Sequence, residues 1–291
     1  MKKFDWNTLA VRRLVTLGLS EDQAHHDVTT RILVRDSWHV QAEIRSNQAG
    51  VVAGLPLVGL YFKAFNFHCR FRTFVKEGAF VQPGQRLAVI EGPARIVLSA
   101  ERPALNALQH LSGIATYTCA QVKRLGRSKT KLLDTRKTLP GWRLLEKYAV
   151  RCGGATNHRM SLGDAILIKE NHLRICRLAG ADWVNDVHSF RQHRRLPLQV
   201  EVQTPEDLRD AVRLKPERVL LDNMAFSTLK KVIQKLRREL PSAEIEISGG
   251  VRPEELPRLS RLGVERISMG RLTHSAPVFD CSLDITGVDT R

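Results

Sequence analysis

Basic side chains are concentrated in residues 134–172, and several of them follow apolar segments. Arg136 and Lys137 follow the run KLLD, and Lys169 directly follows ILI. A cation at the end of a buried strand is poorly placed for simple solvation, and several that converge there can bind a substrate with many negative charges. A solvated basic loop is the alternative, but the stretch also contains a Gly-Gly turn and an Asn-His pair. Its basic residues are Arg136, Lys137, Arg151, His158, Arg159, Lys169 and His172.

Polar and small residues follow the later apolar runs in the same way. Glu201 ends the run QVE and Asp222 ends LLD, whereas Ser248-Gly249-Gly250 and Gly270 follow the last two runs. Lone carboxylates in such positions can hold Mg²⁺ through water or bind ribose hydroxyls. Glycine-rich turns offer backbone N–H groups to a phosphate. Each feature alone is often only a helix cap or a turn, so the prediction depends on their combination.

The spacing of these apolar runs predicts a parallel α/β barrel, open or incomplete, because helical patterns separate most of them. Thr204-Pro205-Glu206-Asp207 is a strong helix start, and we favour a helix for ADWVNDV. The carboxyl ends of parallel strands meet at one edge of a sheet, where barrel enzymes carry their chemistry. The predicted strand cores are 132–133, 165–168, 200–202, 219–221, 245–247 and 267–269.

The first part of the chain has a different pattern. A short amphipathic helix is expected within the first 20 residues, followed by a loop over residues 21–36. Residues 38–97 are rich in glycine turns and predict strands with one helix at residues 57–65. A further helix is expected from residue 99 to about 125, with Pro103 and Arg102 in its first turn.

Composition limits the functional classes. The chain has 291 residues, 43% of them hydrophobic, and a net charge of +16. No apolar run is long enough for a membrane span, and charges interrupt the N-terminal segment, so a cytoplasmic protein without a membrane partner is expected. The positive charge raises nucleic-acid binding as an alternative. It lies largely on solvated helix faces such as LKKVIQKLRREL, however, so a dedicated nucleic-acid partner is not expected.

Long motifs in the chain resemble those of the quinolinate phosphoribosyltransferases. The resemblance covers nearly the whole chain, and the segments DTRKT and CGGATNHR are its most specific parts. Other matching segments are VVAGLPLV, SAERPALNALQHLSGIAT, ILIKENH, VEV, LLDNM, SGG and ISMGRLTHSAPVFDCSLDI.

The resemblance implies a fold, a reaction and an assembly. The fold would be an N-terminal α/β sandwich, residues 1–113 completed by 272–291, joined to an open α/β barrel at 114–271. The enzyme would transfer the phosphoribosyl group of 5-phosphoribosyl-1-diphosphate to quinolinate, with Mg²⁺. Nicotinate mononucleotide, CO₂ and diphosphate would be the products, in NAD biosynthesis. It would work as a homodimer.

The resemblance also assigns roles by position. Arg102 would reach quinolinate in the partner subunit's site, and Lys137 would lie near the reacting centre and the diphosphate. Glu201 and Asp222 would face the ribose and the metal, the metal through water. Quinolinate carboxylates would be bound by Arg136, His158, Arg159 and Lys169, and the 5-phosphate by Ser248, Gly249, Gly250 and Gly270.

Four features depart from the family pattern. Pro103 stands where threonine is usual, Gln203 replaces a frequent second glutamate, and Arg271 occupies the place of a small residue. The loop AHHD also lacks a glycine that is common before its aspartate. None of them removes a proposed catalytic residue.

Two other enzymes are open alternatives. One is a related phosphoribosyltransferase that acts on another aromatic acid, such as nicotinate, without decarboxylation. The other is a Schiff-base barrel lyase, because Lys169 has a suitable place for an imine lysine.

Overall fold

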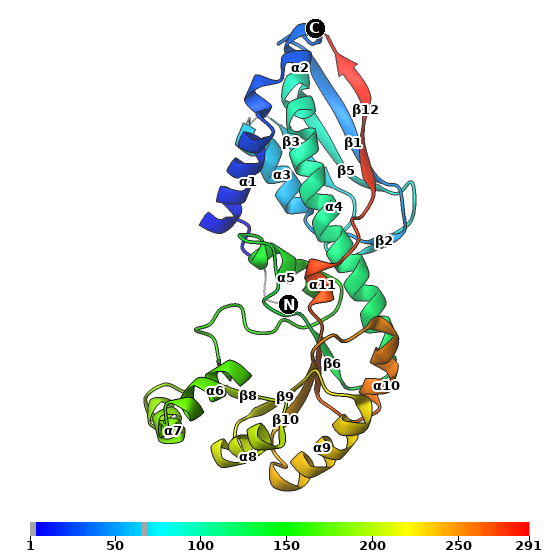
Figure 1. Cartoon of the computed structure of the whole chain (residues 1–291). Helices are drawn as coiled ribbons and strands as arrows, with labels where there is room; N and C mark the ends of the chain where they lie inside the picture. The colour runs from blue at the N-terminus through cyan, green and yellow to red at the C-terminus, as the bar shows by residue number, and fades with distance from the viewer. Residues whose placement is uncertain (1–3, 66–68, 291) are drawn as a thin grey trace. The chain divides into compact units, whose positions relative to one another are not determined.

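The computed structural model describes residues 4–65 and 69–290, and the chain forms two compact units. One unit comprises residues 1–120, 137–155 and 272–291, and the other comprises residues 121–136 and 156–271. Figure 1 shows the elements of both units along the chain. Each combines helices with a sheet, which confirms the predicted α/β class.

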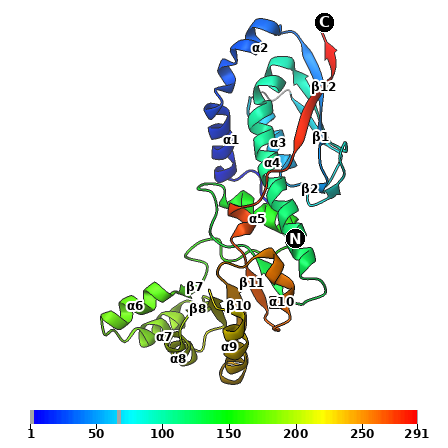
Figure 2. The same cartoon turned by 45° about the vertical axis from the view of Figure 1, so that its right-hand side comes forward.

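The first unit contains an antiparallel sheet of strand order β12-β1-β5-β3. The C-terminal strand β12 pairs along the whole of β1, so two segments from opposite ends of the chain share a ladder. The long helix α4 lies along this sheet (Figures 1 and 2) and buries Val97, Ala104 and Leu108. The strands are β1 (His39–Ser46), β3 (Arg70–Thr73), β5 (Arg86–Pro93) and β12 (Cys281–Asp289), with β2 (Gly50–Val51) and β4 (Phe80–Val81) paired separately. The helices are α1 (Leu9–Glu21), η1 (Ala24–His26), α2 (Val28–Leu33), α3 (Leu55–Phe65), α4 (Ala94–Arg124) and α5 (Arg143–Cys152).

The prediction of a loop over residues 21–36 was wrong, because η1 and α2 occupy part of it. Asp27 is the N-cap of α2: its Oδ1 accepts from the Thr30 N–H at 3.0 Å, and Oδ2 accepts from the Ser99 hydroxyl at 3.0 Å. The β-branched residues of VTTRIL have low helix propensity and conceal this helix, although the Asp27 cap is itself a start signal.

The predicted start of α4 was also wrong. The helix begins at Ala94, so Pro103 and Arg102 lie in its interior instead of its first turn. An interior proline removes one backbone hydrogen bond and costs roughly 3 kcal/mol in an ordinary helix. Burial of Ala94, Val97 and Ala100 explains why the helix nevertheless extends through and before this point.

The second unit contains a parallel sheet of strand order β6-β11-β10-β9-β8-β7. β6 and β7 are its two edges, so the barrel is open, as predicted. All six predicted strand cores are confirmed, as are the helical assignment of ADWVNDV and the Thr204 start of α8. The strands are β6 (Lys131–Leu133), β7 (Ile166–Ile168), β8 (Leu198–Val202), β9 (Arg218–Asp222), β10 (Glu244–Ser248) and β11 (Arg266–Ser268). The remaining helices of the chain are α6 (Glu170–Leu178), α7 (Trp183–His193), α8 (Pro205–Leu214), α9 (Phe226–Glu239), η2 (Pro253–Glu255), α10 (Leu256–Ser260) and α11 (Arg271–His274).

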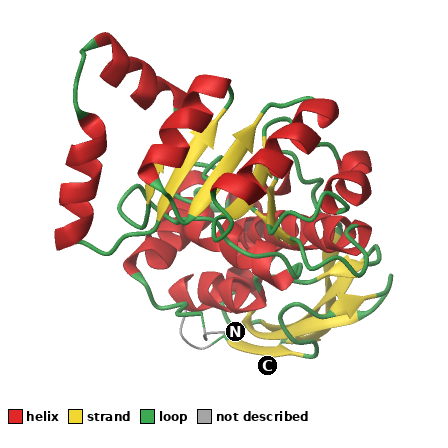
Figure 3. Cartoon of the chain, turned by 90° about the horizontal axis from the view of Figure 1, so that it is seen from below, coloured by secondary structure: helices red, strands yellow, loops and turns green. Residues whose placement is uncertain are grey.

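The two faces of this parallel sheet differ in polarity. Val200, Val219 and Ile245 belong to its apolar side and are buried, and helices flank the strands in Figure 3. Many of the alternate positions are polar, and several of these are buried as well, including Gln199 and Glu246. A polar side chain that is buried in a sheet must have partners there. Within the described residues, no helix is both long and apolar enough to cross a membrane.

Candidate active site

Arg136 and Lys137 follow β6, and a buried carboxylate at the end of this strand organises the segment that carries His158 and Arg159. Asp134 is fully buried at the end of β6. Its Oδ1 accepts from the His158 N–H at 2.7 Å, and its Oδ2 accepts from the Asn157 side-chain amide at 2.6 Å. The backbone of Thr156 also pairs with that of Leu133 in β6 through an isolated parallel bridge. Asp134 therefore fixes the segment that carries His158 and the following arginine.

Two arginines of the predicted set lie close enough to affect each other. Burial and the charge of Arg136 lower the pKa of Arg159, and Arg159 Nη1 donates to the Ala165 carbonyl at 2.9 Å. Crowded, half-buried guanidinium groups are costly unless an anion binds between or beside them. This pair is therefore suited to bind a carboxylate or a phosphate.

Lys169 and Glu201 come from neighbouring strand ends. The Glu201 pKa is raised by burial and by the charge of Asp222, while the charge of Lys169 opposes the shift. Lys169 is exposed. An imine-forming lysine usually needs burial that lowers its pKa, so this environment favours an anion-binding ammonium over the Schiff-base alternative.

Glu201 and Asp222 form a carboxylate pair with an amide between them. Gln203 Nε2 donates to Glu201 Oε1 and to Asp222 Oδ2, at 3.2 Å in each case. Asn223 Nδ2 also donates to Asp222 Oδ2, at 2.6 Å. Across residues 4–65 and 69–290, no cluster of three or more metal-ligating side chains occurs. Two mutually repelling carboxylates still fit a hard cation that keeps several waters.

At a Mg²⁺ site formed by this carboxylate pair, Gln203→Glu would tighten binding by about tenfold, because a third carboxylate increases the ligand charge. Without metal, the added repulsion is expected to lower the unfolding free energy by less than about 1 kcal/mol, since residue 203 is exposed. Titration calorimetry with Mg²⁺ and thermal unfolding measure the two effects. Gln203→Ala is the control, because it removes the amide without adding charge. If the Mg²⁺ affinity of Gln203→Glu is unchanged, residue 203 does not take part in metal binding.

The predicted phosphate turn follows β10. Ser248 pairs in register with Asp222 of β9, which brings the turn beside the carboxylate pair. Gly249 has φ +83°, and a Cβ there would lie 2.4 Å from the Asn223 backbone nitrogen. Only glycine fits this position, and a backbone without side chains can approach a phosphate closely. Gly270 follows β11 at the same edge of the sheet.

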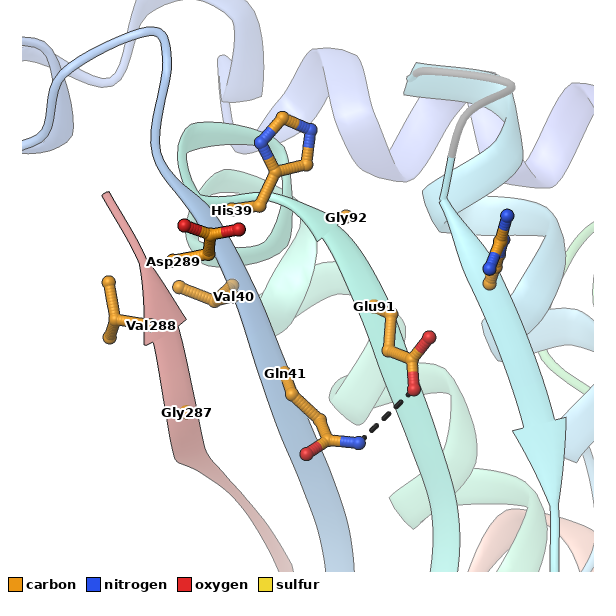
Figure 4. Close-up of a pocket in the computed structure, with 9 residues that line it drawn as sticks. His39, Val40, Gln41, Glu91, Gly92, Gly287, Val288 and Asp289 are labelled. Carbon is orange, nitrogen blue, oxygen red and sulfur yellow. Dashed lines mark hydrogen bonds between the residues drawn. The ribbon is translucent and has the colours of Figure 1, made fainter. Parts of the chain in front are cut away.

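Two predicted residues belong to the other unit. Arg102 is an exposed residue of α4, with Nη2 at 3.9 Å from Glu101. Lys137 is exposed, and its carbonyl accepts from the Thr273 hydroxyl at 2.7 Å. This unit also has a pocket at the sheet formed by β12, β1, β5 and β3 (Figure 4), where Gln41 donates to Glu91 at 3.1 Å. None of the predicted site residues lines it.

Buried polar residues beneath the strand ends were not predicted from the sequence. Glu246 lies in mid-strand, where its Oε2 accepts from Gln199 Nε2 and Arg266 Nε, both at 3.0 Å. Its Oε1 lies 3.4 Å from His158 Nε2. The alternation in EIEIS was the available signal, but such alternation usually indicates a solvated face.

The open parallel sheet, its cationic strand ends, its carboxylate pair and its glycine turn define an α/β enzyme for polyanionic substrates. Two family models match the chain: "Quinolinate phosphoribosyl transferase, N-terminal domain" over residues 27–112, and the corresponding C-terminal domain over residues 114–284. The chain belongs to the quinolinate phosphoribosyl transferase family.

Relatives of similar length support this membership. The nicotinate-nucleotide pyrophosphorylase [carboxylating] of Mycobacterium leprae is 37% identical, over 95% of this chain and 97% of that protein. A probable enzyme of the same name from Bacillus subtilis is 34% identical, over 96% and 95%. The crystal structure of NadC from Streptococcus pyogenes has a TM-score of 0.87 at 32% identity and covers 99% of each chain.

Proposed function

We propose that this protein transfers the phosphoribosyl group of 5-phosphoribosyl-1-diphosphate to quinolinate and releases diphosphate and CO₂. The product is nicotinate mononucleotide, an intermediate of NAD biosynthesis. The observation that carries the proposal is the crowded pair formed by Arg136, which follows Asp134, and Arg159, which lies on the segment that Asp134 holds, in a chain of this family. A substrate with two adjacent carboxylates offsets several cations, whereas nicotinate, with one carboxylate, offsets fewer.

The proposed roles follow the chemistry of each group. Arg136, Arg159 and Lys169 bind the quinolinate carboxylates, with His158 beside them. The 5-phosphate binds at the turn of Ser248, Gly249 and Gly250, together with Gly270. Glu201 and Asp222 face the ribose and would hold Mg²⁺ through water. Lys137 stabilises the departing diphosphate.

The protein mainly positions the substrates and neutralises their charge. As diphosphate leaves, C1 of the ribose develops oxocarbenium character, and the quinolinate nitrogen attacks it from the opposite side. Bound Mg²⁺ would neutralise diphosphate charge. Ribosylation makes the ring cationic, so it stabilises the carbanion that remains on the ring carbon when the adjacent carboxylate leaves as CO₂. A proton from water then bonds to this carbon and completes nicotinate mononucleotide. Positioned charges of this kind replace a covalent nucleophile.

Release of labelled CO₂ from carboxyl-labelled quinolinate tests the reaction. It is expected to require the protein, 5-phosphoribosyl-1-diphosphate and Mg²⁺ together, as omission of each one shows. Turnover of nicotinate without quinolinate turnover would favour the non-decarboxylating alternative.

The domain division, the assembly and the location remain proposals. The boundary between the two family models, at residues 112 and 114, supports a first domain at 1–113 and a barrel domain at 114–271. The pairing of β12 with β1 supports the addition of residues 272–291 to the first domain. A cytoplasmic location remains a prediction from the N-terminal sequence. The assembly is a homodimer in which Arg102 reaches the site of the partner subunit.

Mixing two inactive variants tests the shared site. Arg102→Ala and Arg136→Ala are each expected to be inactive alone. After they are unfolded and refolded together, hybrid dimers contain one intact site, which restores about a quarter of wild-type activity. If Arg102 acts within its own subunit, no hybrid has an intact site and activity stays at background.

A further inference from the structure

Glu246 is a buried carboxylate that no proposed catalytic step uses. It lies in the middle of β10 with no exposed side-chain surface. Its Oε2 accepts from Gln199 and Arg266, both at 3.0 Å, and its Oε1 lies 3.4 Å from His158 Nε2. A buried charge requires such partners, so this network ties β8, β10 and β11 to the loop that carries His158.

The other nitrogen of the His158 ring identifies the protonation state. The Arg159 N–H donates to His158 Nδ1 at 2.7 Å. A ring nitrogen that accepts a hydrogen bond carries a lone pair, so the proton of a neutral ring lies on Nε2 and points toward Glu246. In a doubly protonated ring, the hydrogen on Nδ1 would face the hydrogen of the Arg159 N–H, so two donors would oppose each other.

The cations near His158 favour the same state. Burial and the charge of Arg136 already lower the pKa of Arg159, so a further cation beside them would be unfavourable. Arg266 compensates the charge of Glu246, whose Oε1 lies 3.4 Å from His158 Nε2. Asp134 accepts from the His158 backbone N–H.

We propose that Glu246 is a positioning residue that holds His158 as the neutral Nε2–H tautomer, so that Nδ1 fixes the Arg159 backbone. Both ring nitrogens of His158 are then engaged within the protein, so the ring contributes shape to the site and the arginines supply the charge. The effect on quinolinate rests on the proposed function, whereas the tautomer does not. Loss of Glu246 should weaken quinolinate binding more than phosphoribosyl diphosphate binding, because it disturbs the segment of residues 158–159.

Long-range ¹⁵N–¹H correlation spectra of the wild-type chain, labelled at histidine nitrogens, test the tautomer at neutral pH. His158→Gln assigns the signals by their loss. The expected pattern is a pyridine-type Nδ1 shift and a pyrrole-type Nε2 shift. Two pyrrole-type shifts, or the reverse assignment, would overturn the proposal.

Glu246→Ala tests the positioning role, and Glu244→Ala is the matched control. Glu244 lies on the same strand and the same side but pairs with Arg218 and Arg266. In folded Glu246→Ala, we expect loss of the fixed tautomer and a rise of about tenfold in the KM for quinolinate. The KM for phosphoribosyl diphosphate should change by less than about twofold, and the control should keep the tautomer.

The outcomes separate the proposal from its premises. A fixed tautomer in folded Glu246→Ala, or equal changes in both KM values, would refute the role of Glu246. If Glu246→Ala does not fold, the wild-type spectrum still tests the proposed tautomer, and a different tautomer there would refute the proposal. If the wild-type chain does not turn over quinolinate, the proposed function fails, and the same spectrum still decides the tautomer.

Discussion

Arg136→Ala is expected to lower kcat/KM for quinolinate by about 10²- to 10³-fold while the protein stays folded. Arg136 is half-buried just after the end of β6, and its charge contributes to lowering the pKa of Arg159. Its removal leaves a substrate carboxylate without a bidentate partner in a partly desolvated site. Steady-state kinetics with quinolinate varied at saturating phosphoribosyl diphosphate measures the loss.

Two further variants make this result specific. Arg136→Lys keeps the charge but loses the planar fork, so a smaller loss of about tenfold is expected. Arg238→Ala removes an exposed cation from α9 and should leave kinetics unchanged. If Arg136→Ala retained wild-type kcat/KM with quinolinate, the assignment of the carboxylate site to this loop would be wrong.

Asp134→Asn is expected to impair both stability and catalysis, although it changes only one atom type. Asp134 is fully buried and accepts from the His158 N–H and from the Asn157 amide. In either orientation, the Nδ2 group of an asparagine would face one of these donors. We expect the unfolding free energy to fall by about 1–3 kcal/mol, and kcat/KM for quinolinate by about 10- to 100-fold.

Urea unfolding and steady-state kinetics measure the two effects of Asp134→Asn. Asp164→Asn is the comparison, because Asp164 accepts from Met160 and Ser161 in the same segment but is exposed. Its loss of stability should be smaller, since water can satisfy the groups that it leaves. Equal effects of the two substitutions would show that burial of Asp134 is not what organises the loop.

The positions of the parallel strands along the chain and the edge that carries the chemistry were predictable from the sequence. Each apolar core of the parallel sheet is a short local run, and the residue after it is read directly from the chain: Lys169 after ILI, Glu201 in QVE, Asp222 in LLD. Parallel strands share one direction, so their carboxyl ends meet at one edge wherever the runs are correctly identified. Local caps such as Thr204 were predictable for the same reason, because cap and helix are neighbours in sequence.

The incorrect predictions arose where burial overrides local preference. Pro103 indicates a helix start by its own chemistry, yet α4 begins at Ala94 because the preceding turns are buried. Residues 28–33 have weak helix propensity, but Asp27 caps them and also binds Ser99 of α4. Neither packing partner can be read from the local sequence.

The groups available to the site follow from the amino-acid sequence alone: the cations, the carboxylate pair, the glycine turn and the strand ends that carry them. How these groups are held and charged depends on the folded structure. Asp134 contacts the loop of residue 158, and Glu246 contacts His158, although the partners are far apart in the chain. Such contacts form when strands from distant segments align in register and exclude water, and their strength depends on that burial. Side-chain type is a property of the chain, whereas desolvation, tautomer and pairing are properties of the fold.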